Sequence, residues 1–328
     1  MAQYSLVIPV YNEEESLKEL YREITEVAQS GNDDIEIIFI DDGSRDSSWS
    51  VIESLTEQDD RVSGIRFRRN FGKAAALEAG FKAATREIVF TLDADLQDDP
   101  REIPDFLRIM DSGYDVVSGW KKRRHDPWHK VWPSRIFNGM VSSLTGVKLH
   151  DHNCGMKCYR REIFNEVTLY GELHRFVPVL AAARGYRVTE KVVQHRARQF
   201  GVSKYGFTRF VKGFLDLLTV KFITGYGQRP QHLLGTLGLI AFGVGSLILL
   251  ILAALWCMSR IPFFGFEEVY CLSGRPAVIY SAALMLLGGQ LLSIGIIAEL
   301  LISYQRHPRQ EYSIKTQIGR KETPPEKD

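Results

Sequence analysis

The sequence predicts an α/β protein with a mostly parallel sheet and helices on both faces, followed by an interfacial amphipathic helix and a two-helix transmembrane hairpin. Three observations favour this class. Short apolar runs alternate with helical patterns in the first 93 residues. An amphipathic run follows at 205–228, and residues 233–304 are mostly apolar.

The first part of the chain contains four expected strands and three expected helices. The strands are the apolar runs at 4–10, 35–40, 62–67 and 87–93. The helices lie between them at 13–30, 46–58 and 72–85. We expect Ser44 or Asp46 to cap the second of these helices. After residue 120 the pattern loosens until the amphipathic run begins.

Polar clusters follow three of these strands: VYNEE at 10–14, DDGS at 41–44 and DADLQDDP at 93–100. Because ligands bind beyond the carboxyl ends of the strands in open α/β sheets, we expect the three clusters to meet in one crevice. The acids of DDGS can accept hydrogen bonds from a ribose or a base.

The last cluster carries Asp93, Asp95, Asp98 and Asp99, which repel one another and therefore need a positive partner. Asp93 and Asp95 are two residues apart at a strand end, so both carboxylates can reach one cation. Hard oxygen ligands favour Mg²⁺ or Mn²⁺ over Zn²⁺. The alternative is a solvated acidic loop.

Two uncharged segments, 233–258 and 276–298, are each long enough to cross a bilayer as a helix, with the second helix extending to 304. The alternative is a pair of buried core helices. Basic residues gather before the first segment and after the second, and the positive-inside rule then places both termini in the cytoplasm. We expect a multi-pass protein of the inner (cytoplasmic) membrane, with a cytosolic α/β domain at 1–204, juxtamembrane helices at 205–232, a transmembrane pair at 233–304 and a cytosolic tail at 305–328.

Composition narrows the remaining possibilities. The 41 basic and 40 acidic residues nearly balance, so charge gives no case for nucleic-acid binding. Cys154 and Cys158 fall in the cytosolic part, where thiols stay reduced, and Cys257 and Cys271 lie close enough to the outer face to pair there.

The ordered motifs VIPVYNEE, DDGS, RRNFGK (68–73), DADLQDDP, HNCGMKCYRR (152–161) and the segment at 196–205 resemble family-2 glycosyltransferases with a GT-A fold. The resemblance covers roughly residues 4–230 and is specific to the branch that charges a polyprenyl phosphate with one sugar. That branch includes bactoprenol glucosyltransferase and dolichyl-phosphate mannose synthase. It implies a Rossmann-like GT-A domain at 1–204.

The resemblance also implies roles for individual residues. The nucleotide pocket would contain Pro9, Tyr11, Glu13, Asp41, Asp42, Lys73 and Asp93. Asp93, Asp95 and Gln97 would surround the metal. Asp93, Asp95, Arg198 and Lys204 would form the catalytic set. The lipid phosphate would meet Lys122, Arg124, Lys130, Ser134, Arg135 and Ser203. Lys121 belongs to the same basic stretch, for which the alternative is a solvated loop.

The expected reaction is inverting, metal-dependent transfer of one sugar from a nucleotide-sugar, UDP-glucose or another UDP-hexose, to undecaprenyl phosphate. The acceptor phosphate is already ionised, so a strong general base is less necessary. We expect a homo-oligomer, and the related glucosyltransferase suggests a tetramer. Two alternatives are a non-catalytic nucleotide-sugar-binding membrane scaffold and a processive polysaccharide synthase, although the QxxRW motif of such synthases is absent from the sequence.

Overall fold

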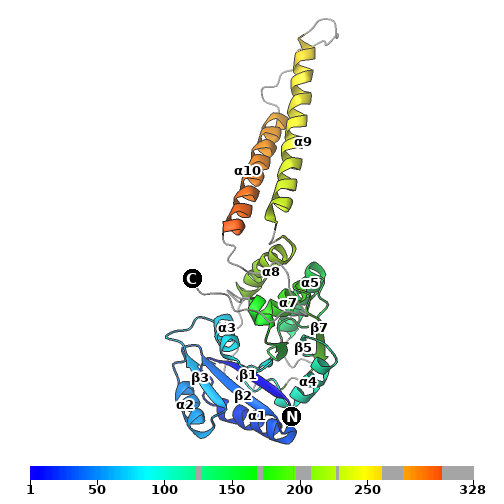
Figure 1. Cartoon of the computed structure of the whole chain (residues 1–328). Helices are drawn as coiled ribbons and strands as arrows, with labels where there is room; N and C mark the ends of the chain where they lie inside the picture. The colour runs from blue at the N-terminus through cyan, green and yellow to red at the C-terminus, as the bar shows by residue number, and fades with distance from the viewer. Residues whose placement is uncertain are drawn as a thin grey trace, which may run out of the picture. The chain divides into compact units, whose positions relative to one another are not determined.

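The computed structural model describes residues 1–122, 128–167, 173–194, 196, 208–226, 229–260 and 276–304. The described chain forms two compact units, one at Met1–Val220 and one that begins at Lys221. Figure 1 shows the sheet and its helices in the first unit and the helices α9 and α10 in the second.

One sheet organises the first unit, with the strand order β3-β2-β1-β4-β6-β5-β7. The strands are β1 (Gln3–Val10), β2 (Asp34–Asp41), β3 (Val62–Arg66), β4 (Ile88–Thr91), β5 (Val116–Trp120), β6 (Lys157–Arg160) and β7 (Val188–Val192). Strands β1, β2, β3 and β4 are parallel, and so are β5 and β7. Strand β6 runs antiparallel to both of its neighbours. The mostly parallel sheet predicted from the sequence is confirmed.

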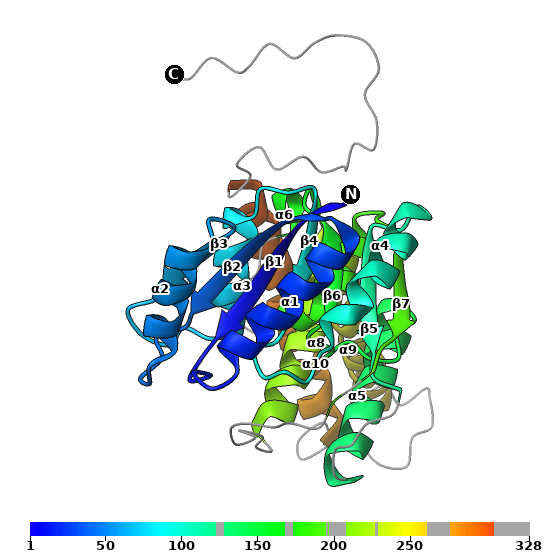
Figure 2. The same ribbon diagram turned by 90° about the horizontal axis from the view of Figure 1, so that it is seen from below.

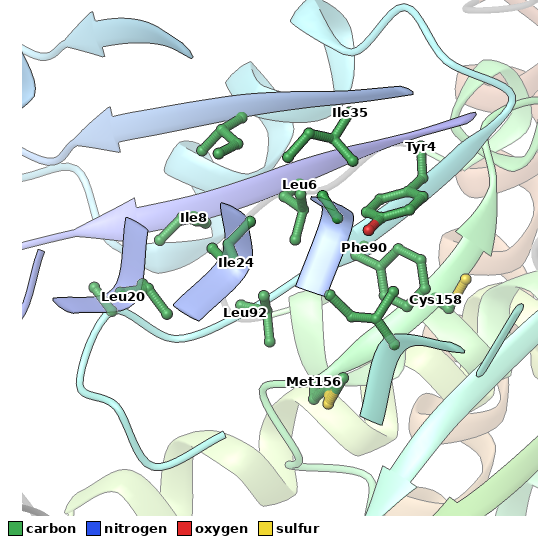
Figure 3. Packing of buried hydrophobic residues seen from close by; sticks show 14 of the residues in the cluster. Tyr4, Leu6, Ile8, Leu20, Ile24, Ile35, Phe90, Leu92, Met156 and Cys158 are labelled. Carbon is green, nitrogen blue, oxygen red and sulfur yellow. The ribbon is translucent and has the colours of Figure 1, made fainter. Parts of the chain in front are cut away.

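Helices connect the strands. They are α1 (Leu17–Gly31), α2 (Ser48–Gln58), α3 (Lys73–Ala83), α4 (Ile103–Asp111), α5 (Trp128–Thr145), α6 (Ile163–Glu166) and α7 (Val177–Ala183), with short 3₁₀ turns at Pro100–Glu102 and Leu173–Phe176. Alternating strand residues point to opposite faces, and the helices cover both. On one face Leu6, Ile8 and Phe90 pack with α1, α2 and α4 (Figure 3), and Figure 2 shows α1 in front of the sheet. On the other face Val7 and Ile40 pack with α3, α6 and α7.

Helix α8 (Thr208–Tyr226) matches the predicted amphipathic run. Its Leu217 and Val220 are fully buried with Phe137 and Val141 of α5. Its Phe214, Leu215 and Leu218 are exposed and apolar. One face of α8 therefore packs in the core of the first unit and another leaves apolar side chains exposed, and the interfacial position of the helix stays a prediction.

Helices α9 (Pro230–Ser259) and α10 (Pro276–Tyr304) form the second unit. They approach closely at glycines: a Cβ at Gly238 would lie 2.8 Å from the Gly288 carbonyl oxygen, and one at Gly245 would lie 2.7 Å from the Ser281 carbonyl oxygen. Both helices are long and apolar enough to cross a membrane, and only 17% and 11% of their most apolar windows are buried. That exposure favours membrane spans over a pair of core helices.

The structure corrects one detail of the predicted elements and adds others. Helix α2 begins at Ser48, and its N-cap residue is Ser47, whose side chain makes no capping hydrogen bond, while Asp46 Oδ1, one residue earlier, accepts the Ser48 N–H at 3.0 Å. Ser44 instead accepts the Asn12 N–H, so its predicted capping role is wrong. Strands β5, β6 and β7 and helices α4 to α7 were not assigned from the sequence. The sequence leaves open whether Cys257 and Cys271 pair, and Cys271 lies outside the described ranges.

Candidate active site

The loops after β1 and β2 are joined by hydrogen bonds. Asn12 N–H donates to Ser44 Oγ at 3.0 Å, Glu13 N–H donates to Ser48 Oγ at 2.9 Å, and Arg45 N–H donates to Asn12 Oδ1 at 2.8 Å. Asn12 adopts a left-handed backbone with φ of 56°, a conformation that asparagine tolerates better than most residues. The VYNEE and DDGS clusters therefore form one structure at the end of the sheet, as predicted.

The two acids of DDGS position the neighbouring loops. Asp41 Oδ1 accepts the Ser44 N–H at 2.9 Å, and its other oxygen lies 3.2 Å from Arg66 Nε. Asp42 accepts the N–H groups of Phe71 at 2.6 Å and Gly72 at 2.9 Å. Burial raises the pKa of Asp42 although these two hydrogen bonds favour the carboxylate. Asp42 thus holds the RRNFGK loop against the end of β2.

A cleft of about 650 Å³ opens beside these loops. It is lined by Tyr11, Gly43, Ser44, Arg45, Arg66, Phe67, Arg68, Arg69 and Asn70. Of the predicted nucleotide-binding residues, Tyr11 lies in this lining, and Asp41 contacts two lining residues. Four guanidinium groups beside aromatic side chains make the cleft suited to an anionic ligand that also offers a flat ring.

The acidic cluster after β4 is met by lysines. Lys73 Nζ, from the first residue of α3, donates to Asp93 Oδ1. Lys121 Nζ lies 2.9 Å from Asp98 Oδ1, and this pair is nearly buried. A Cβ on Gly155 would lie 2.5 Å from Asp93 Oδ2 and 2.8 Å from Asp98 Oδ2, so the two carboxylates lie close together against this glycine.

These ion pairs shift the pKa values of Asp93 and Lys121. Burial alone would raise the pKa of Asp93, but the ammonium groups of Lys73 and Lys121 outweigh it and hold the pKa at about 2. Burial acts to lower the pKa of Lys121, but the Asp98 carboxylate outweighs burial, so its pKa lies above the usual range. Asp93 is therefore ionised at neutral pH.

The chain between Asp95 and Asp99 adopts a tight, partly strained turn. Asp95 Oδ1 accepts the Gln97 N–H at 3.2 Å. Leu96 has φ of 60° with a buried side chain, a conformation that costs leucine energy and that the surrounding packing must hold. Asp99 accepts the Arg101 N–H at 3.0 Å and so caps the following 3₁₀ turn.

Arg196 holds this turn from the other end of the domain. Its Nη1 donates to both carboxylate oxygens of Glu23 on α1, at 2.7 and 2.8 Å. Its Nη2 lies 2.6 Å from Asp99 Oδ2, and its N–H donates to the Gln97 carbonyl oxygen at 3.1 Å. One side chain thus connects three segments that are distant in sequence.

We expect Arg196→Met to lower the free energy of unfolding of the first unit by about 2 kcal/mol, because it leaves Glu23 and Asp99 partly buried without their partner. Thermal unfolding of the purified protein measures the change. Arg22→Met is the matched control, since Arg22 pairs with Glu19 and Glu26 on the exposed face of α1 and should matter little. Equal melting temperatures for the two variants would contradict this role of Arg196.

Two further titratable groups are buried next to the cluster. Lys157, at the start of β6, is 4% exposed and donates to the His152 carbonyl oxygen at 3.1 Å. Burial lowers its pKa to about 8. Burial and the nearby Lys157 lower the pKa of His152 to about 4, so this imidazole is neutral at physiological pH. Its Nε2 lies 3.2 Å from Ser142 Oγ.

The predicted lipid-phosphate residues differ in exposure, and some of them lie outside the described ranges. Lys122 and Arg135 are exposed, Ser134 is half-buried, and the Lys122 ammonium lies 5.5 Å from the centroid of the Trp120 ring. Lys130 falls within α5. Arg124, Arg198, Ser203 and Lys204 lie outside the described residues. Lys121 is nearly buried in its pair with Asp98, so the solvated-loop alternative is wrong for this residue, and a role for Lys121 toward the lipid phosphate stays a prediction.

The acidic cluster fits a divalent cation of the Mg²⁺ type. Within the described ranges, no group of three or more His, Cys, Asp or Glu side chains is arranged to hold a metal ion. Asp93 and Asp95 still offer carboxylates at one strand end. Mg²⁺ is commonly held by one or two carboxylates and by substrate phosphates, so this donor set suits an ion that arrives together with a phosphorylated ligand.

A cleft beside the ends of parallel strands, next to an acidic strand end, is typical of the class of open α/β proteins that bind a ligand beyond the strand ends. Comparison with known proteins narrows this class. Residues 5–168 match the model of glycosyl transferase family 2. The chain is 36% identical to dodecaprenyl-phosphate galacturonate synthase of Rhizobium johnstonii, over 91% of this chain and 87% of that protein. It is 35% identical to undecaprenyl-phosphate 4-deoxy-4-formamido-L-arabinose transferase of Pseudomonas fluorescens, over 90% and 84%.

The chain therefore belongs to glycosyl transferase family 2 and is a glycosyltransferase, as predicted. A solved structure of glucosyl-3-phosphoglycerate synthase from Mycobacterium tuberculosis, in complex with Mn²⁺, uridine diphosphate and phosphoglyceric acid, has the same fold, with a TM-score of 0.53 and 14% identity. The likeness covers 68% of this chain and 78% of that one. At this identity it supports the GT-A fold alone.

Proposed function

We propose that this protein transfers a single sugar from a nucleotide-sugar, UDP-glucose or another UDP-hexose, to undecaprenyl phosphate, with inversion at the anomeric carbon. One observation carries the proposal. The arginine-lined cleft connects through Asp42, the Gly72–Lys73 turn and the Lys73–Asp93 pair to the acidic end of β4. A ligand with a base at one end and a diphosphate at the other suits such a crevice.

The relatives support the acceptor. Both are named for transfer to a polyprenyl phosphate, and each is matched over nine-tenths of this chain. The sugars in their names differ from each other and from the hexose proposed here. The two apolar helices support a membrane-embedded acceptor. We place the catalytic domain and both termini on the cytoplasmic side of the inner membrane.

The donor would bind with its base in the cleft beside Tyr11 and its ribose near Asp41, Asp42, Pro9 and Glu13. Asp93 and Asp95, with Gln97, would hold Mg²⁺ or Mn²⁺. When bound, such an ion neutralises the negative charge that develops on the leaving diphosphate. Lys73 supplies a further positive charge at the same place.

The acceptor phosphate is ionised near neutral pH, so its oxygen attacks without a strong general base. Asp98 is unsuited to that task, because Lys121 pairs with it in a buried setting. We assign phosphate orientation to Lys122, Ser134 and Arg135, together with Arg124, Lys130, Ser203, Arg198 and Lys204. The apolar face of α8 around Leu215 and Leu218 would lie in the membrane interface close to this acceptor. We also propose that the protein forms a homo-oligomer, with a tetramer as the first candidate.

The test is a donor panel. Purified protein is incubated with undecaprenyl phosphate, Mn²⁺ or Mg²⁺, and radiolabelled UDP- and GDP-sugars, and label is measured in the organic phase. We expect one donor to label an acid-labile lipid, and EDTA to abolish the transfer until metal is returned. Transfer that persists in EDTA would contradict the metal dependence. Nucleotide binding without transfer from any donor would favour a non-catalytic scaffold.

A further inference from the structure

The acidic cluster contains two lysine–carboxylate pairs of very different accessibility. In the Lys121–Asp98 pair the side chains are 13% and 1% exposed. In the Lys73–Asp93 pair they are 34% and 31% exposed. Breaking a buried pair leaves an uncompensated charge and is strongly unfavourable, whereas a pair in contact with water separates at little cost. The Lys73 pair is therefore the one that can exchange partners.

The place of Lys73 in its helix indicates that its charge serves the site rather than the fold. Lys73 is the first residue of α3, where the helix dipole disfavours a positive charge. Its backbone is nevertheless held firmly, because Gly72 has φ of 95° and its N–H donates to Asp42. Gly72 thus turns the chain so that the Lys73 side chain reaches Asp93.

The charges of the acidic cluster favour exchange over simultaneous occupation of Asp93 by Lys73 and a cation. The carboxylates of Asp93, Asp95 and Asp98 face the ammonium groups of Lys73 and Lys121, and the buried Lys157 lies near Asp93. A divalent cation added to this set would give it excess positive charge and repel Lys73. A diphosphate that arrives with the cation offers Lys73 a new anionic partner.

We propose that Lys73 is an exchangeable counter-ion: it neutralises Asp93 until donor binds, and it passes to the donor diphosphate when a divalent cation takes its place on Asp93. This inference rests on the proposed function. Its consequence is reciprocal coupling, in which metal and nucleotide each increase the affinity for the other. The protein would bind little metal before the nucleotide is present.

The test measures Mn²⁺ binding to the full-length protein in detergent by electron paramagnetic resonance, without nucleotide and with saturating UDP or uridine. In the unchanged protein we expect UDP to tighten Mn²⁺ binding by at least about 10-fold and uridine to have no effect, since coupling energies of this kind typically change affinity by 5- to 150-fold. In Lys73→Met we expect nucleotide-free Mn²⁺ binding to tighten about 10-fold, while UDP binding weakens.

The matched control is Lys82→Met, which removes an exposed lysine from the same helix, where it pairs with Glu78. Its Mn²⁺ and UDP affinities should equal those of the unchanged protein, and thermal unfolding verifies that both variants are folded. Nucleotide-free Mn²⁺ affinity that is the same with and without Lys73 would overturn the inference. A protein that binds UDP but no Mn²⁺ under any condition would instead overturn the metal dependence in the proposed function.

Discussion

Replacing Asp95 by Asn is expected to reduce sugar transfer by at least about 100-fold, because it removes one charge from the donor set that would hold the cation at the leaving diphosphate. The exchange keeps the size of the side chain and an oxygen that can still accept the Gln97 N–H. The fold should therefore survive, and thermal unfolding should show little change.

The matched control is Asp111→Asn, at an exposed carboxylate that ends α4. It should transfer sugar at the rate of the unchanged protein. Label in the organic phase measures both variants side by side. If Asp95→Asn retained more than a tenth of the original rate at saturating metal, Asp95 would not belong to the catalytic set.

Gly155→Ala is expected to lower both the transfer rate, by about 10-fold or more, and the free energy of unfolding, by about 1 to 3 kcal/mol. The added methyl group would lie 2.5 Å from Asp93 Oδ2 and 2.8 Å from Asp98 Oδ2, far inside van der Waals contact. Asp98 cannot move away easily, because it is buried with Lys121. The carboxylates would have to separate, and the geometry of the acidic cluster would be lost.

Gly139→Ala provides the comparison for this variant. Gly139 is exposed on α5, with no atom within 4 Å of the position that a Cβ would take. Alanine there should leave transfer unchanged and stabilise the helix slightly. Steady-state transfer rates and melting temperatures measure the pair. Equal behaviour of the two alanine variants would show that the close approach of Gly155 does not position the acids.

The first four strands were predicted from the sequence, and β1, β2 and β4 are largely apolar. Strand β1 is almost wholly buried between two helical layers, and its residues 6–10, LVIPV, form an apolar run that indicates a parallel strand. Strand β7 reads VTEKV and is only partly buried at the edge of the sheet, so its pattern resembles a loop. Strand β6 begins with Lys157, a charge that burial patterns exclude from a core strand.

The candidate site also contains residues that the sequence predicted and residues that it did not. The acids at strand ends were found because they follow recognisable apolar runs. Lys121 was misplaced because KKRR reads as a solvated basic loop, and its partner Asp98 follows β4, which β6 separates from β5 in the sheet. Arg196 was passed over for a related reason: its contacts with Glu23 and Asp99 depend on tertiary packing that periodicity does not encode.

The most direct test of the central claim is the mass of the lipid product. Undecaprenyl phosphate is incubated with the protein, metal and the active nucleotide-sugar, and the lipid is analysed by mass spectrometry. The account predicts a single new species, heavier by one sugar residue and with the original phosphate retained. A ladder of several sugar residues would identify a processive synthase, and an unchanged lipid mass in the presence of bound donor would contradict transfer to this acceptor.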